Sequence, residues 1–91
     1  MAVNVRIPAP LRTLTGDQEL VSADGATLAD VVEHLEASYP GMRERLCEDD
    51  GELRRFVNVF VNGEDVRFLS GLASELSEGD EVSIVPAVAG G

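Results

Sequence analysis

The residues best suited to chemistry stand at the end of the chain. The sequence closes with Gly90-Gly91, and a terminal glycine leaves its carboxylate unhindered for reaction. Because glycine has no Cβ, such a pair can pass through a narrow channel with any backbone angle. Residues 86–91 span about 20 Å when extended, which is enough to reach a deep active site on another protein. The ending therefore predicts either a reactive carboxylate or a frayed terminus.

The other candidate reactive side chains have no partners in the sequence. The chain contains one cysteine, Cys47, and one histidine, His34. A structural zinc site needs four Cys or His ligands and a Cys-ligated iron–sulfur cluster needs four thiolates, so we expect no metal site of either kind. No Ser–His–Asp order, phosphate-binding glycine loop or carboxylate pair stands out. We expect a packed free thiol at Cys47 and a surface or boundary position for His34.

Length and charge limit the classes of function. The 91 residues suffice for one small domain. Seventeen acidic residues against seven arginines and no lysine give a net charge of −10, which argues against binding nucleic acid or an anionic membrane. No secretory signal and no apolar run of about 20 residues is visible. The composition predicts a cytoplasmic protein without a bound cofactor, whose natural partner is a basic protein surface.

Hydrophobic spacing predicts the elements that must position the terminus. Apolar residues alternate over 3–7 and again over about 18–23, which indicates two strands. Thr27 caps a helix that ends at Pro40-Gly41. The strongest strand covers 56–61, and the Asn62-Gly63 turn after it predicts a return strand at 66–68. Residues 69–76 are expected to be irregular or to form a single helical turn, and a closing strand at 82–85 stops before Pro86. The expected apolar stripe of the helix consists of Leu28, Val31, Val32, Leu35 and Tyr39.

The order of these elements predicts an α+β fold. Two strands, one helix and a second group of strands fit a mixed sheet with one main helix packed on one face. We expect the first and last strands to be central and parallel, which is the ubiquitin-like β-grasp arrangement. Residues 1–86 would form the β-grasp domain and residues 87–91 a flexible C-terminal tail. A fold alone assigns no function.

A β-grasp pattern that ends in Gly-Gly resembles the ubiquitin-like sulfur carriers of the MoaD/ThiS type. These include the small subunit of molybdopterin synthase, the thiamin carrier and the carrier of cysteine biosynthesis. The resemblance covers essentially the whole chain, and its most specific parts are residues 56–62, 64–68, 79–82 and 86–91. Those parts look closest to the carriers of cysteine biosynthesis. The molybdopterin subunit commonly has a second proline where this chain has Ala87.

The resemblance implies a carrier and substrate rather than an enzyme with its own catalytic residues. An E1-like enzyme would use ATP to adenylate Gly91, and a persulfide-bearing sulfurtransferase would then install sulfur to give a nucleophilic thiocarboxylate. The implied acceptor is a cysteine synthase that acts on O-phosphoserine and holds pyridoxal phosphate itself, followed by a peptidase that releases cysteine. The residues expected to enter partner active sites are Pro86, Ala87, Val88, Ala89 and Gly90.

The globular part of the chain would supply docking. Phe56 or Phe60, according to which strand face is exposed, would form an apolar patch near the tail with Phe68 and Val85. In the alternative, all four side chains belong to the core. Two other functions stay open: a molybdopterin synthase small subunit that donates sulfur for the molybdenum cofactor, and a ubiquitin-like interaction or modifier protein without a sulfur role.

Overall fold

The computed structural model describes residues 2–86, so the expected tail at residues 87–91 lies outside the described residues. The strands are β1 (Ala2–Arg6), β2 (Leu20–Asp24), β3 (Val57–Val61), β4 (Glu64–Asp65) and β5 (Glu81–Pro86). The helices are α1 (Leu28–Ser38) and α2 (Met42–Leu46). Three 3₁₀ turns are η1 (Ala9–Leu14), η2 (Val66–Phe68) and η3 (Gly71–Ala73).

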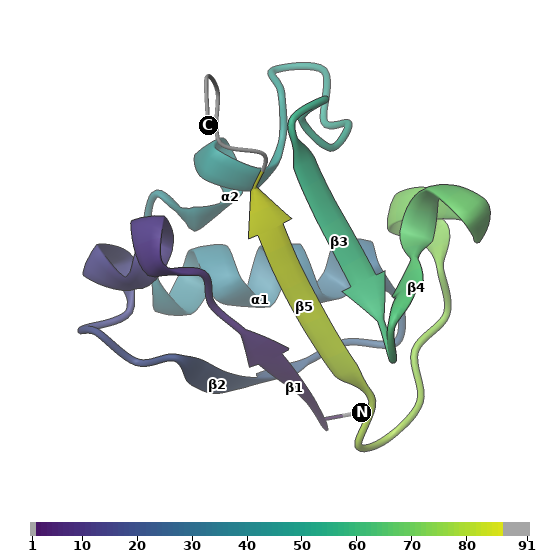
Figure 1. The fold of residues 1–91 in the computed structure, drawn as a ribbon, viewed down its shortest axis with the longest axis horizontal. Coiled ribbons are helices and arrows are strands. Elements are labelled where there is room, and N and C mark those ends of the chain that lie inside the picture. The colour runs from purple at the N-terminus through teal and green to yellow at the C-terminus, as the bar shows by residue number, and fades with distance from the viewer. Residues whose placement is uncertain (1, 87–91) are drawn as a thin grey trace.

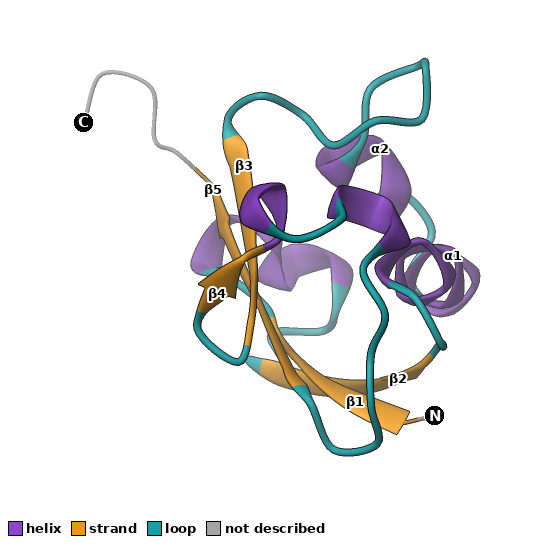
Figure 2. Cartoon of the chain, turned by 90° about the vertical axis from the view of Figure 1, so that its right-hand side faces the viewer, coloured by secondary structure: helices purple, strands orange, loops and turns teal. Residues whose placement is uncertain are grey.

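The strands form one mixed sheet in the order β2-β1-β5-β3-β4 (Figure 1). β1 and β5 are parallel neighbours inside the sheet, whereas β2 pairs with β1 and β3 pairs with β5 in antiparallel register. Figure 2 shows α1 and α2 on one side of the sheet. The predicted β-grasp arrangement, with parallel first and last strands and one main helix, is confirmed.

Helix α1 forms because its first turn is capped and one face is apolar. The Thr27 hydroxyl accepts from the Asp30 backbone N–H at 3.3 Å, and the Asp30 carboxylate accepts from the Thr27 backbone N–H at 3.3 Å. This reciprocal pair satisfies two helix-end N–H groups. The helix ends at Ser38, and Tyr39 packs against the core as a partly buried side chain. The buried residues of the predicted stripe are Leu28, Val31, Val32 and Leu35.

The prediction of a return strand at residues 66–68 is wrong. β4 contains only Glu64 and Asp65, and Val66–Phe68 forms the 3₁₀ turn η2. The Asp65 carboxylate accepts from the Arg67 backbone N–H at 2.8 Å, which caps this turn. A short side chain that binds nearby backbone in this way competes with strand pairing. The chain therefore leaves the sheet after two residues, and Val66 becomes fully buried.

Candidate functional site

β5 carries the chain to Pro86, the last described residue, at one end of the sheet (Figure 1). Pro86 lies opposite Val57, the first residue of β3. We call Val57, Val85 and Pro86 the tail root, because the expected reactive tail continues from there. The predicted reactive residue, Gly91, and residues 87–90 lie outside the described residues.

The four aromatic and aliphatic residues expected near the tail root all lie outside the core. Phe68, Phe56 and Val85 expose 86%, 66% and 46% of their surface, and Phe60 is half-buried. Alternate residues of β3 are buried, so Asn58 and Phe60 lie on the face opposite the core. Val85 of β5 is the cross-strand neighbour of Asn58. We call Phe56, Phe60, Phe68 and Val85 the apolar patch.

One arginine forms hydrogen bonds with the start of β3, beside the tail root. Arg67, in η2, donates from Nη1 to the Asn58 side-chain oxygen. Its Nη2 lies 2.8 Å from the Val57 carbonyl oxygen and 3.1 Å from the carbonyl oxygens of both Arg54 and Arg55. Two Nη2 hydrogens are thus shared among three acceptors. A single side chain binds η2 to the start of β3.

The contacts of Arg67 do not follow from the strand predicted at residues 66–68. The signal that could have revealed them is Asp65, because an Asp favours a turn at the residues that follow it. A turn there would have removed the partner strand from the first residues of β3. Their carbonyl groups would then have needed another donor.

A second set of polar contacts closes the opposite end of the β3–β5 pair. Asn62 Nδ2 donates to Asp80 Oδ1 at 3.0 Å, and the Glu81 backbone N–H donates to Asn62 Oδ1 at 3.0 Å. The Ser77 backbone N–H donates to Asp80 Oδ2 at 2.8 Å. The hydrogen bonds from Asn62 and Ser77 lower the pKa of Asp80 below its ordinary value, because they stabilise the ionised carboxylate.

The ion pairs of the described residues lie at the surface. Arg6 contacts Glu19 and Glu81 at 3.3 Å each, and Arg54 contacts Glu48 at 3.1 Å. Such exposed pairs contribute about 0–1 kcal/mol each. The Arg54–Glu48 pair connects the exposed acidic loop at 48–52 to the segment before β3. No ion pair of Arg67 with a carboxylate is found among residues 2–86.

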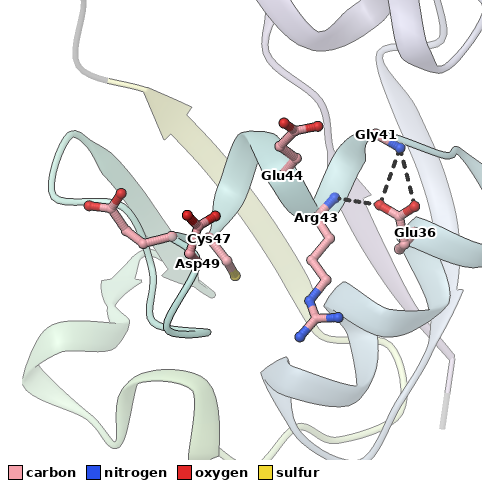
Figure 3. A pocket seen from close by; sticks show the side chains of 7 residues that line it. Glu36, Gly41, Arg43, Glu44, Cys47 and Asp49 are labelled. Carbon is pink, nitrogen blue, oxygen red and sulfur yellow. Dashed lines mark hydrogen bonds between the residues drawn. The ribbon is translucent and has the colours of Figure 1, made fainter.

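A shallow surface pocket lies between the end of α1, α2 and the acidic loop (Figure 3). The Glu36 carboxylate accepts from the backbone N–H groups of Gly41 and Arg43 at 3.2 and 3.0 Å. Its oxygens are therefore occupied by the start of α2. Cys47 is buried as predicted, and this burial raises the pKa of its thiol, so the thiolate form is disfavoured. The lining residues are Glu36, Gly41, Arg43, Glu44, Cys47, Glu48 and Asp49.

Neither a metal site nor a membrane-spanning helix is found in the described part of the chain. No three His, Cys, Asp or Glu side chains of residues 2–86 gather closely enough to hold a metal ion. No helix there has the length and apolarity needed to cross a membrane. His34 is half-buried on α1, which confirms its expected boundary position.

Comparison with known proteins decides the family. Residues 5–91 match the ThiS family. The chain belongs to this family. The ThiS-family chain is 55% identical, over 93 residues and the full length of both proteins, to the sulfur carrier protein CysO of Mycobacterium tuberculosis. It is 43% identical, again over both full lengths, to small archaeal modifier protein 3 of Haloferax volcanii.

A solved structure supports the same assignment. The ThiS-family chain superposes with a TM-score of 0.92 and 47% identity on a chain of the Amycolatopsis orientalis BexX/CysO complex, covering 98% of this chain and 99% of that one. The expected membership in the MoaD/ThiS-type ubiquitin-like family is confirmed. The β-grasp fold of residues 2–86 is likewise confirmed by this superposition.

Proposed function

We propose that this ThiS-family protein is a sulfur carrier whose Gly91 is adenylated and converted to a thiocarboxylate. The observation that carries the proposal is the tail root: β5 brings the chain to Pro86 at the sheet end, beside an exposed apolar patch. That arrangement suits a chain end that enters another protein while the patch docks. The relative named sulfur carrier protein CysO matches this chain over its whole length.

The chemistry requires activation because a carboxylate has no good leaving group. The Gly91 carboxylate attacks the α-phosphate of ATP on an E1-like enzyme and releases pyrophosphate. A persulfide sulfur then displaces AMP, and a thiol reduces the resulting acyl disulfide to leave a thiocarboxylate on Gly91. A thiocarboxylic acid is far more acidic than a thiol, so the sulfur is an anionic nucleophile at neutral pH. Because ATP is a cytoplasmic substrate, we assign the protein to the cytoplasm.

The sulfur acceptor we propose is a cysteine synthase that uses O-phosphoserine. The synthase, which would supply its own pyridoxal phosphate, would release phosphate from O-phosphoserine. The thiocarboxylate sulfur would then add to the carbon that carried the phosphate, and a proton would add to the neighbouring α-carbon. An acyl shift from sulfur to nitrogen then leaves cysteine attached to Gly91 through a peptide bond, and a peptidase releases it. Small side chains at Ala87 and Ala89 suit entry of the tail to about 3–3.5 Å from the reacting carbon.

The apolar patch is proposed to dock on the E1-like enzyme. Exposed aromatic side chains near the centre of an interface supply much of its binding energy. The patch is continuous with the tail root through Val85 and Pro86, so a protein bound there lies next to the tail. The net charge of −10 favours an acceptor surface bordered by basic side chains.

Intact-mass analysis of protein purified from its native cells tests the carrier function. We expect a fraction in which sulfur replaces oxygen, located on the C-terminal peptide and retarded in a mercury-containing gel. Protein truncated before Gly91 serves as the control and should show no such fraction. Only unmodified protein under sulfur-replete, protease-inhibited conditions would contradict the proposal.

Two reconstituted reactions test the acceptor. The loaded carrier should give cysteine attached to Gly91 when mixed with an O-phosphoserine-dependent synthase. It should give no molybdopterin with the large subunit of molybdopterin synthase and its pterin precursor. Sulfur found only in molybdopterin would move the assignment to the molybdopterin alternative.

A modifier function is the second candidate, because small archaeal modifier protein 3 matches this chain over its full length. Conjugation through Gly91 to lysines of other proteins would produce high-mass adducts that contain the C-terminal peptide. Their absence from native-cell extracts, together with a thiocarboxylate fraction, would favour the sulfur carrier. The chain itself contains no lysine and so offers no internal side-chain amine to the activated end.

A further inference from the structure

Val57, on the β3 side of the tail root, forms no backbone hydrogen bond with β5. Hydrogen bonds alternate along an antiparallel pair. The Asn62 backbone N–H donates to the Glu81 carbonyl at 2.8 Å, so these two residues form a hydrogen-bonded pair. Val57 and Pro86 lie five residue pairs away in the same register. Because five is odd, they form a pair without hydrogen bonds between them. Pro86 also lacks an N–H. The backbone groups of Val57 therefore point away from β5.

The strand on the other side of β3 ends before it reaches this position. β4 pairs only with Phe60 and Val61. Continuing the same register would place residue 67 opposite Asn58, but η2 has already turned the backbone away. The Arg67 guanidinium occupies that place instead, with donors on the Asn58 side-chain oxygen and the Val57 carbonyl. The Arg67 side chain thus supplies hydrogen-bond donors to the edge of β3, as the backbone of a longer β4 would have done.

The same guanidinium links the two chain segments that carry the most exposed aromatic residues of the apolar patch. Phe68 follows Arg67 directly in the chain, and Phe56 follows Arg55, whose carbonyl accepts from Arg67. These two phenylalanines make few contacts of their own, as their exposed fractions of 86% and 66% show. Their relative placement therefore depends on the backbone segments that Arg67 connects.

We propose that Arg67 is a positioning residue for activation of the tail, because it holds the apolar patch and the Val57 side of the tail root in one arrangement. This inference rests on the proposed function. Arginine suits the role because its planar fork directs several donors at once, whereas lysine offers a point charge on a flexible stem. Arg67 acts through the apolar patch and the tail root.

The test compares Arg67→Met with Arg6→Met in ATP–pyrophosphate exchange driven by the E1-like enzyme of the same cells. Both variants remove one exposed arginine from the same protein, so their effects on net charge are identical. We expect Arg67→Met to raise the KM for the carrier about tenfold with little change in kcat, since misplaced docking groups weaken binding before chemistry. Arg6→Met, which loses only surface ion pairs, should retain wild-type values.

Two further measurements separate positioning from general stability. Exchange is assayed well below the melting temperature of each variant, and amide NMR spectra locate the structural change. Spectral changes should be confined to residues 54–58 and 66–69, and Arg67→Lys should give a KM between those of wild type and Arg67→Met. These results would support the positioning role.

The opposite results overturn it. Equal KM values for Arg67→Met and Arg6→Met would show that the contacts of Arg67 do not serve activation. Spectral changes throughout the α1 core, or failure of both Arg67 variants to fold, would identify a general stability residue. Wild-type carrier that is never adenylated would overturn the proposed function as well, whereas normal adenylation of wild type limits the failure to Arg67.

Discussion

The two ends of the β3–β5 pair are closed in different ways. Where β3 ends and β5 begins, Asn62 and Asp80 join two turns through short side chains and neighbouring backbone groups. Where β3 begins and β5 ends, Arg67 reaches in from η2 to hold the strand edge. The first end is built from local polar contacts, and the second depends on one long side chain.

The two ends also differ in what they present to solvent. The Asn62 end is polar, whereas the tail-root end exposes Phe56, Phe68 and Val85. Exposed apolar clusters on a small domain are characteristic of interaction sites. The contrast supports the proposal that one end of this strand pair serves stability and the other serves docking. Substitutions at one end should therefore change unfolding, and substitutions at the other should change activation.

The largest effect is expected at the tail. Gly90→Val should lower the rate of adenylation by about 100-fold or more, because a branched side chain obstructs a channel that must hold the carboxylate in line. The thermal melting temperature should stay at the wild-type value. Pyrophosphate exchange and a thermal melt measure the two quantities, with Gly90→Ala as a graded control. Adenylation of Gly90→Val at the normal rate would show that no narrow channel is involved.

The apolar patch should have the next largest effect. Phe68→Ser should reduce kcat/KM for adenylation about tenfold, since a docked aromatic side chain is a typical interface hot spot. Its melting temperature should change little, because Phe68 is 86% exposed. Leu20→Ser is the matched control, an exposed apolar residue on the edge strand β2. Equal losses in the two variants would argue against a localised docking surface.

The opposite end should affect stability alone. Asn62→Gly keeps the left-handed backbone that Asn62 adopts at φ 51° but removes its side-chain hydrogen bonds. We expect a loss of about 1 kcal/mol in the free energy of unfolding. The two lost hydrogen bonds contribute about 1 kcal/mol each, and the ease with which glycine adopts a positive φ partly offsets their loss. Chemical denaturation of Asn62→Gly, Asp80→Ala and the double variant should reveal coupling between the two sites. A change in KM for adenylation would contradict the separation of the two ends.

The smallest effect concerns pH. The native pKa of Asp80 lies below its ordinary value of 3.8. Its ionised form therefore contributes stability above pH 3.8, and this contribution is lost as the pH falls through the lower native pKa. The difference in unfolding free energy between wild type and Asp80→Asn should shrink between neutral pH and about pH 3. A difference that grows on acidification would reverse the assigned direction.

The sequence by itself determined the elements that depend on local spacing. The helix over Leu28–Ser38 follows from the Thr27 cap, the Asp30 partner and apolar residues three and four apart, all within one segment. Alternation likewise located β1 and β5, and the parallel pairing of these strands followed from the order of the elements. Burial of Cys47 was also predictable from residue type.

Only the tertiary structure decided which side chains form the apolar patch and how the tail root is held. Residues 56–61 are apolar on both faces except for Asn58, so alternation alone did not assign a face. Helix α1 covers one face of the sheet. Val59 is buried on that face, whereas Phe60 lies on the other face and is half-buried. The role of Arg67 depends on contacts with carbonyl groups ten to thirteen residues away. Local propensity cannot encode such contacts, because they exist only after β4 stops short and η2 turns back against β3.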